Sequence, residues 1–155
     1  IPTDKRAESV IVGDDIKPFA ALSPQLKGIM PAHVIYHQVD PLPAGFSRYW
    51  LQNVLRRQQQ FSGVIFSDDL TMEGASMAGS YPERAQAAKE AGCDMVLVCN
   101  QFEKALEVLD WIEGEGWQPD QQRLMGMRSQ CQWDLDELKQ MERWCNTQQL
   151  MSKLI

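Results

Sequence analysis

Two adjacent carboxylates stand at the end of an apolar run near the middle of the chain. The stretch FSGVIFSDDL, residues 61–70, reads as a buried strand that finishes with Asp68 and Asp69. A carboxylate in that position loses hydration, so it needs an interaction or a role that compensates. Three roles are open: a catalytic carboxylate, an oxygen ligand for Mg²⁺, and a cap or turn residue that bonds the loop backbone.

Other polar groups fall at the ends of neighbouring predicted strands. His33 follows one such strand, and Cys99 with Asn100 ends another. Parallel sheets gather ligands and catalytic groups at the carboxyl ends of their strands, so we expect these groups to converge. Neighbouring side chains on extended backbone point to opposite faces, so only one aspartate can project into a given site. A hydrogen-bonded structural histidine also fits position 33.

An alternation of helices and strands must position these groups. The apolar spacing predicts helices over residues 14–22, 47–59, 81–91 and 101–112, and strands over 27–30, 63–66 and 94–99. The strand over 63–66 is led by glycine and wholly apolar, which is typical of a parallel strand covered on both faces. Helices alternating with strands predict right-handed βαβ units and an α/β fold with a parallel sheet.

Capping residues mark the starts of the predicted helices. Asp14 or Asp15 can cap the first helix, and Ser47 stands at the N-cap position of the second. Ser80 and Glu83 have the S-x-x-E spacing of a capping box. These signals set the helix boundaries.

The chain changes character after residue 118. No strand signal follows, and Asp134 with Glu137 predicts the capped start of one long helix carrying Leu138, Met141 and Cys145. We expect the terminal helices, about residues 118–155, to pack on the outside of the sheet.

Composition and charge exclude several classes of protein. Hydrophobic residues make up 44% of the 155 residues and charged residues 23%, which is globular composition. The net charge of −6 and the lack of clustered Lys and Arg argue against a nucleic-acid partner. No apolar run has the roughly 18 residues that a membrane span needs. A soluble protein with no membrane or nucleic-acid partner is expected.

The cysteines do not form a metal-binding or disulfide pattern. Cys93, Cys99, Cys131 and Cys145 include no C-x-x-C pair and no histidine at a zinc-like spacing. We interpret them as reduced thiols that act as small hydrophobic residues in a cytosolic protein. No metal and no cofactor is implied.

A longer stretch carries a resemblance to a known family. Residues 54–71, VLRRQQQFSGVIFSDDLT, resemble the active-site signature of glycoside hydrolase family three, in which a helix end leads into a strand that finishes with Ser-Asp. The segments IMPAHVIY, FSDDLTMEGASMAGSY and AGCDMVLVCN are similar to the cytoplasmic β-N-acetylglucosaminidases of that family. The resemblance runs from about residue 14 to residue 112 and more loosely to the end.

The resemblance implies an activity and roles for three residues. It implies a retaining exo-β-N-acetylhexosaminidase of the cytoplasm that removes terminal N-acetylglucosamine from muropeptides during peptidoglycan recycling. Asp68 falls on the nucleophile, which forms a covalent glycosyl-enzyme ester. Asp69 becomes a supporting residue, and His33 falls near the sugar pocket as a substrate-binding residue.

The resemblance also implies that the chain is one part of a larger domain. The family fold is a (β/α)8 barrel of about 250 residues, so residues 1–155 are expected to be the C-terminal part of a single catalytic barrel whose N-terminal half is a missing partner. The general acid/base, a histidine assisted by an aspartate on a mobile loop, is expected upstream of Ile1. The chain alone is therefore expected to be inactive.

Departures from the family pattern are few, and two alternatives stay open. Gln60 and Ser62 replace a Gly and an Asp that are more usual ahead of the strand. A Mg²⁺-dependent phosphoacceptor or phosphotransfer domain also places aspartates at strand ends, but it usually needs a lysine at a further strand end, where this chain has Cys99 and Asn100. The other alternative is a non-catalytic interaction module derived from a hydrolase fold.

Overall fold

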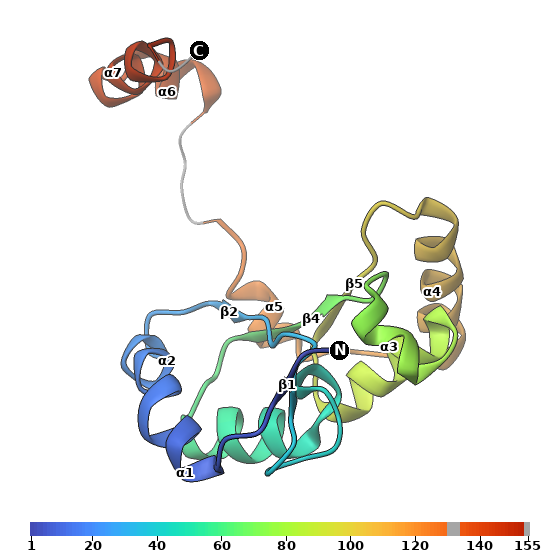
Figure 1. The fold of residues 1–155 in the computed structure, drawn as a ribbon. Coiled ribbons are helices and arrows are strands. Elements are labelled where there is room, and N and C mark those ends of the chain that lie inside the picture. The colour runs from blue at the N-terminus through green and yellow to red at the C-terminus, as the bar shows by residue number, and fades with distance from the viewer. Residues whose placement is uncertain (130–133, 154–155) are drawn as a thin grey trace.

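The computed structural model describes residues 1–129 and 134–153 and has the expected α/β architecture (Figure 1). The strands are β1 (Thr3–Asp4), β2 (Gly28–Ile29), β3 (Ile35–Tyr36), β4 (Val64–Asp69) and β5 (Met95–Leu97). The helices are α1 (Glu8–Val10), η1 (Ile11–Asp15), α2 (Lys17–Leu22), η2 (Ala44–Phe46), η3 (Tyr49–Gln58), η4 (Glu73–Ala78), α3 (Tyr81–Ala91), α4 (Phe102–Glu115), α5 (Gln121–Met125), α6 (Leu135–Gln140) and α7 (Glu142–Met151).

The main sheet is wholly parallel, as predicted. Its strand order is β2-β4-β5, so successive strands are neighbours and the segments between them, with η3 and α3, are the crossovers. A second parallel pair joins β1 to β3. The sequence pattern does not predict this pair, because two residues are too few to show an alternation. Strand β4 runs to Asp69, so the two aspartates are its last residues and do not follow it.

Of the three caps predicted before residue 118, two are confirmed. The N–H of Trp50 donates to Ser47 Oγ at 3.2 Å at the start of the helix that contains η3. Ser80 and Glu83 form the capping box of α3, and Gly92, with φ of 116°, ends that helix. The cap at Asp14 or Asp15 is wrong, since helical backbone already begins at Glu8 and both aspartates lie inside it.

The core lies between the sheet and the helices on one of its faces. Ala85 and Ala88 of α3 are fully buried and, lacking long side chains, let the helix lie close to Ile65 of β4. Ile65 and Ser67 are completely buried, whereas Phe66 is only partly covered. Val64 points to the face opposite Ile65 and is also completely buried. The expectation that β4 is covered on both faces therefore holds at Val64 and Ile65, and the second face is only partly covered at Phe66.

A buried ion network fixes the amino ends of the strands. Asp94, just before β5, accepts from Arg56 and from Arg123, at 2.6 Å in each case. Its Oδ2 also accepts the N–H of Ile65 at 2.9 Å, which ties it to β4. Arg56 further donates to the carbonyl of Gly63 at 2.6 Å. The network thus joins η3, β4, β5 and α5 at one end of the sheet.

The end of the chain differs from its prediction. The capping box of Asp134 and Glu137 is confirmed, but the helix it starts stops at Gln140, and extended backbone at Met141 (ψ 134°) separates α6 from α7. These two helices contact each other, have no buried residue, and lie apart from the sheet in Figure 1. The expected packing on the sheet is found only for α5, which Arg123 joins to Asp94.

The cysteines only partly follow their prediction. Cys93, Cys99 and Cys145 are free thiols, and Cys131 lies outside the described residues. Cys93 fits the expected role of a small hydrophobic residue, since it is buried in the hydrophobic core, and this burial raises the pKa of its thiol to about 12. Cys145 is exposed, so that role is wrong for it.

We predict that Asp94→Ala destabilises the fold by about 3–5 kcal/mol, because it leaves the guanidinium of Arg56 buried without its counter-charge. Urea unfolding of a polypeptide that contains these residues measures the loss. Glu107→Ala is the control: it breaks the exposed pair with Lys104 and should cost less than about 1 kcal/mol. Equal losses of unfolding free energy for the two variants would contradict the stabilising role of the Asp94 network.

Candidate active site

An irregularity in β4 directs the side chains at its end. Phe66 pairs with Met95 and Asp69 pairs with Leu97, so β4 has one residue more than β5 between the two pairs. Such a bulge re-aims the side chains beside it. The hydroxyl of the buried Ser67 accepts the N–H of Leu97 at 2.9 Å, and this bond supplies a partner where the ladder is interrupted.

Backbone N–H groups hold the Asp68 carboxylate. Its Oδ1 accepts the N–H of Asp69 at 2.9 Å, and its Oδ2 lies 3.4 Å from the N–H of His33. In the part of the chain that the structure describes, no ion pair to Asp68 is found, and the residue is only half-buried. A carboxylate fixed in this way keeps lone pairs free for an electrophile or a cation.

Asp69 turns the other way and bonds the loops. Its carboxylate accepts the N–H of Thr71 at 2.9 Å, the hydroxyl of Thr71 at 2.7 Å and the N–H of Cys99 at 3.1 Å. Burial alone raises the pKa of the Asp69 carboxyl, but these bonds outweigh it, so the pKa lies below its ordinary value. Asp69 therefore joins the ends of β4 and β5.

His33 is buried against the two aspartates. Its side chain is 3% exposed, with its ring centroid 5.3 Å from that of Phe46. Nε2 lies 3.2 Å from the carbonyl oxygen of Asp69, while Nδ1 is buried without a hydrogen-bond partner. The burial does not favour the sugar contact expected from the sequence. His37, in contrast, is exposed.

The structure brings together most of the predicted site residues. His33, Asp68, Asp69 and Cys99 are linked by the hydrogen bonds given above. Asn100 is exposed and has φ of 58°, as a turn residue does. Burial and the nearby Asp69 and Asp68 carboxylates raise the pKa of the Cys99 thiol, which makes it a weak nucleophile.

Sequence reasoning missed two residues that shape this site. Ser67 supports the bulge, and the one available signal was a hydroxyl in an otherwise apolar strand. Gly74 lets η4 lie against His33, because a Cβ built on Gly74 would come 2.7 Å from His33 Cβ. No local signal identifies a glycine of this kind.

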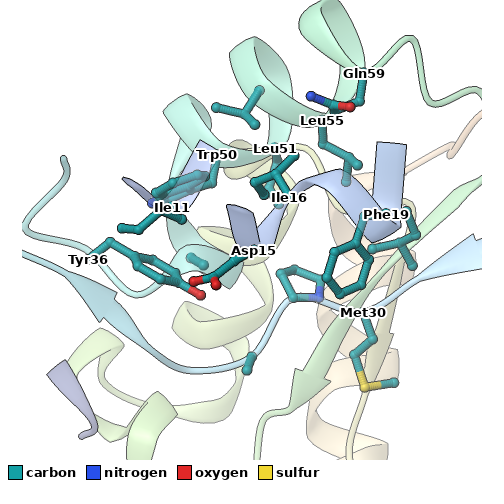
Figure 2. Close-up of a pocket in the computed structure, with 15 residues that line it drawn as sticks. Ile11, Asp15, Ile16, Phe19, Met30, Tyr36, Trp50, Leu51, Leu55 and Gln59 are labelled. Atoms are coloured by element: carbon teal, nitrogen blue, oxygen red, sulfur yellow. The ribbon is translucent and has the colours of Figure 1, made fainter. Parts of the chain in front are cut away.

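A separate apolar cavity lies away from these carboxylates (Figure 2). It has a volume of about 260 Å³ and lies between the helical stretch of η1 and α2, helix η3 and the end of β2. Figure 2 shows Phe19, Trp50 and Leu51 around it, with Asp15 and Tyr36 as polar neighbours. Neither aspartate of β4 contributes to its walls, so the cavity is separate from the Asp68 site.

The described residues contain neither a cluster of metal-binding side chains nor a membrane-spanning helix. Residues 1–129 and 134–153 contain no group of three or more His, Cys, Asp or Glu side chains that could hold a metal ion. Among the same residues, no helix is long and apolar enough to cross a membrane.

Comparison with known proteins identifies the family. Residues 1–122 match the family described as "Glycosyl hydrolase family 3 N terminal domain". The chain belongs to this family. It is 51% identical over 148 residues to a protein named beta-hexosaminidase from Idiomarina loihiensis, and 43% identical over 155 residues to one of the same name from Haemophilus ducreyi.

These matches involve less than half of each relative. The first covers 93% of this chain but 44% of the Idiomarina protein, and the second covers 99% and 45%. Among solved structures, NagZ from Neisseria gonorrhoeae in complex with N-trifluoroacetyl-D-glucosamine superposes with a TM-score of 0.79 at 40% identity. That superposition covers 99% of this chain and 45% of the other.

We predict that Asp69 makes stability dependent on pH. Because its pKa is lowered by folding, its stabilising contribution is complete above the unfolded value of 3.8 and is lost as the pH falls through the lower folded value. Asp69→Asn should therefore be less stable than the wild type at about pH 6, and the gap should narrow by about pH 3.

Unfolding midpoints in urea across that range measure the gap. Asp136→Asn is the matched control, because the Asp136 side chain is 87% exposed and its substitution should alter stability little at any pH. A gap for Asp69→Asn that stays constant down to about pH 3 would contradict the role of its ionised form.

Proposed function

We propose that the polypeptide containing this chain is a retaining exo-β-N-acetylhexosaminidase with Asp68 as its nucleophile. The observation that carries the proposal is the Asp68 carboxylate, held by the N–H groups of Asp69 and His33 at the carboxyl end of β4. Catalytic groups collect at that end of parallel strands in barrel enzymes. Membership of glycosyl hydrolase family 3 supports the same conclusion.

The chemistry requires a fixed, ionised carboxylate. An oxygen of Asp68 attacks the anomeric carbon of the terminal sugar, and a C–O ester bond forms as the glycosidic C–O bond breaks. The leaving oxygen takes a proton from a general acid, which we place in the part of the enzyme outside this chain. Water then cleaves the ester and regenerates the carboxylate.

The proposed substrate is a muropeptide with a terminal N-acetylglucosamine, processed in the cytoplasm during peptidoglycan recycling. Relatives named beta-hexosaminidase support the sugar class. The gonococcal structure holding N-trifluoroacetyl-D-glucosamine supports an N-acylated glucosamine. The recycling role and the cytoplasmic location rest on the sequence resemblance.

We further propose that residues 1–155 are the C-terminal part of a (β/α)8 barrel, with α5–α7 as additional helices. The all-parallel order β2-β4-β5 and the coverage of less than half of the relatives support this architecture. An apolar stripe on α4 also supports this architecture. Its residues Phe102, Leu106 and Leu109 are 74%, 38% and 47% exposed, as expected of a helix face that packs against another part of the barrel. The remaining half of the barrel is the proposed partner of this surface.

No observation favours the two alternatives. In a Mg²⁺-dependent phosphoacceptor, both carboxylates would have to bind the cation. Both oxygens of Asp69 already accept hydrogen bonds from Thr71 and Cys99. A non-catalytic interaction module does not require a half-buried carboxylate that is held by two N–H groups, as Asp68 is.

We predict that Asp68→Ala abolishes turnover. The assay uses a chimaera in which this chain is joined to the segment of the Idiomarina loihiensis relative that it does not span. The variant should cleave a chromogenic N-acetylglucosaminide slower by several orders of magnitude, because no other group can form the ester. A fluorosugar that traps the intermediate should label Asp68 in the unmodified chimaera.

The control for this experiment is Ser62→Ala, an exposed position ahead of the same strand, which should keep full activity. Turnover that survives Asp68→Ala, or a fluorosugar adduct on another residue, would remove the nucleophile assignment.

We predict that residues 1–155 alone behave as an incomplete domain. Because β2 and β5 each leave one edge unpaired in the sheet, the isolated chain should self-associate on size exclusion and melt without a sharp transition. The chimaera should elute as a defined species and unfold cooperatively. A monomeric chain with cooperative, native-like unfolding would contradict the barrel proposal.

A further inference from the structure

We infer that His33 is a positioning residue for the nucleophile Asp68 and makes no contact with the sugar. The inference rests on the proposed function. It assigns His33 a role through its neighbours: the backbone of residue 33 faces Asp68, while the imidazole fixes Asp69.

The contacts form a closed loop around the end of β4. The His33 N–H faces Asp68 Oδ2 at 3.4 Å, and the imidazole Nε2 lies 3.2 Å from the Asp69 carbonyl. Asp69 in turn donates its N–H to Asp68 Oδ1 at 2.9 Å. Residue 33 therefore acts on the Asp68 carboxylate in two ways, directly and through Asp69.

The hydrogen bond determines the state of the imidazole. A carbonyl oxygen can only accept, so Nε2 must carry the proton. Among the described residues, Nδ1 is buried and has no hydrogen-bond partner, so the ring is held through Nε2. His33 thus acts as a donor toward the backbone.

Packing keeps the imidazole in one place. Phe46 lies against one side of the ring, and η4 approaches so closely at Gly74 that a Cβ there would lie 2.7 Å from His33 Cβ. A side chain that is 3% exposed has almost no surface left for a substrate. These facts favour a fixed support over a binding group.

The position of this support matters because β4 is irregular there. The extra residue between Phe66 and Asp69 removes the regular ladder that would otherwise fix the strand end. A nucleophile must be held in near-attack geometry, and an error of about 1 Å can cost about 100-fold in rate. His33 replaces the missing ladder constraint from the side of β2.

The test compares His33→Leu with His33→Gln in the full-length chimaera. His33→Leu removes the donor, and it should lower kcat about 10- to 100-fold while KM changes less than about twofold. His33→Gln keeps an N–H donor and should recover most of the loss. The rate of fluorosugar labelling of Asp68 at saturation should fall and recover in parallel.

Two glycines provide a second, independent pair of variants. Gly74→Ala forces His33 to shift, because its new Cβ would meet His33 Cβ at 2.7 Å, and it should reproduce the loss of kcat. Gly45→Ala also faces His33, but its Cβ would lie 3.9 Å from Nδ1 and 3.5 Å from the nearest atom, which is ordinary contact. Gly45→Ala should therefore keep the activity of the unmodified chimaera.

Three results would overturn the inference. A raised KM with unchanged kcat in His33→Leu would indicate a sugar contact. Unchanged kcat in both His33→Leu and Gly74→Ala, with Asp68→Ala inactive, would remove the positioning role and leave the proposed function standing. Turnover by Asp68→Ala would instead remove the nucleophile assignment and the inference together.

Discussion

The parallel pairing of β4 with two neighbours, interrupted by one extra residue, governs the rest of this structure. Pairing with β2 and β5 fixes the direction and register of the central strand. The interruption between Phe66 and Asp69 frees the strand end from that register and re-aims the side chains beside it. The Asp69 carboxylate bonds the neighbouring loops, while Asp68 stays half-buried. A regular strand would impose strict alternation on the same residues.

The freed strand end is held by side chains in place of ladder bonds. The Ser67 hydroxyl accepts the N–H of Leu97 in β5. The Asp69 carboxylate accepts from Thr71 and from Cys99, and His33 approaches from the end of β2. These groups come from all three strands of the sheet or from the residues that follow them. The geometry of the proposed nucleophile is thus a property of the sheet as a whole, and no single loop determines it.

Local signals allowed much of this fold to be predicted, and distant contacts account for what was missed. The caps at Ser47 and Ser80 were predictable because each depends on residues within four positions. The convergence of His33 with Asp68 followed from the rule that parallel strands share one carboxyl edge. The bulge depends on the contact of Ser67 with Leu97, and the position of His33 depends on its contact with Asp69. The partners in each pair are 30 and 36 residues apart, and no sequence periodicity indicates contacts of that range. The break at Met141 had no recognisable signal.

The ion network around Asp94 lies at the opposite end of β4 from Asp68 and Asp69. Ile65, to which Asp94 is bonded, lies three residues before Asp68, which is roughly 10 Å along the strand. Substitutions around Asp94 can therefore change the stability of the fold without touching the Asp68 carboxylate. For an engineer, the Asp94 end is the place for compensating substitutions when changes at the Asp68 end have lowered the stability of the fold.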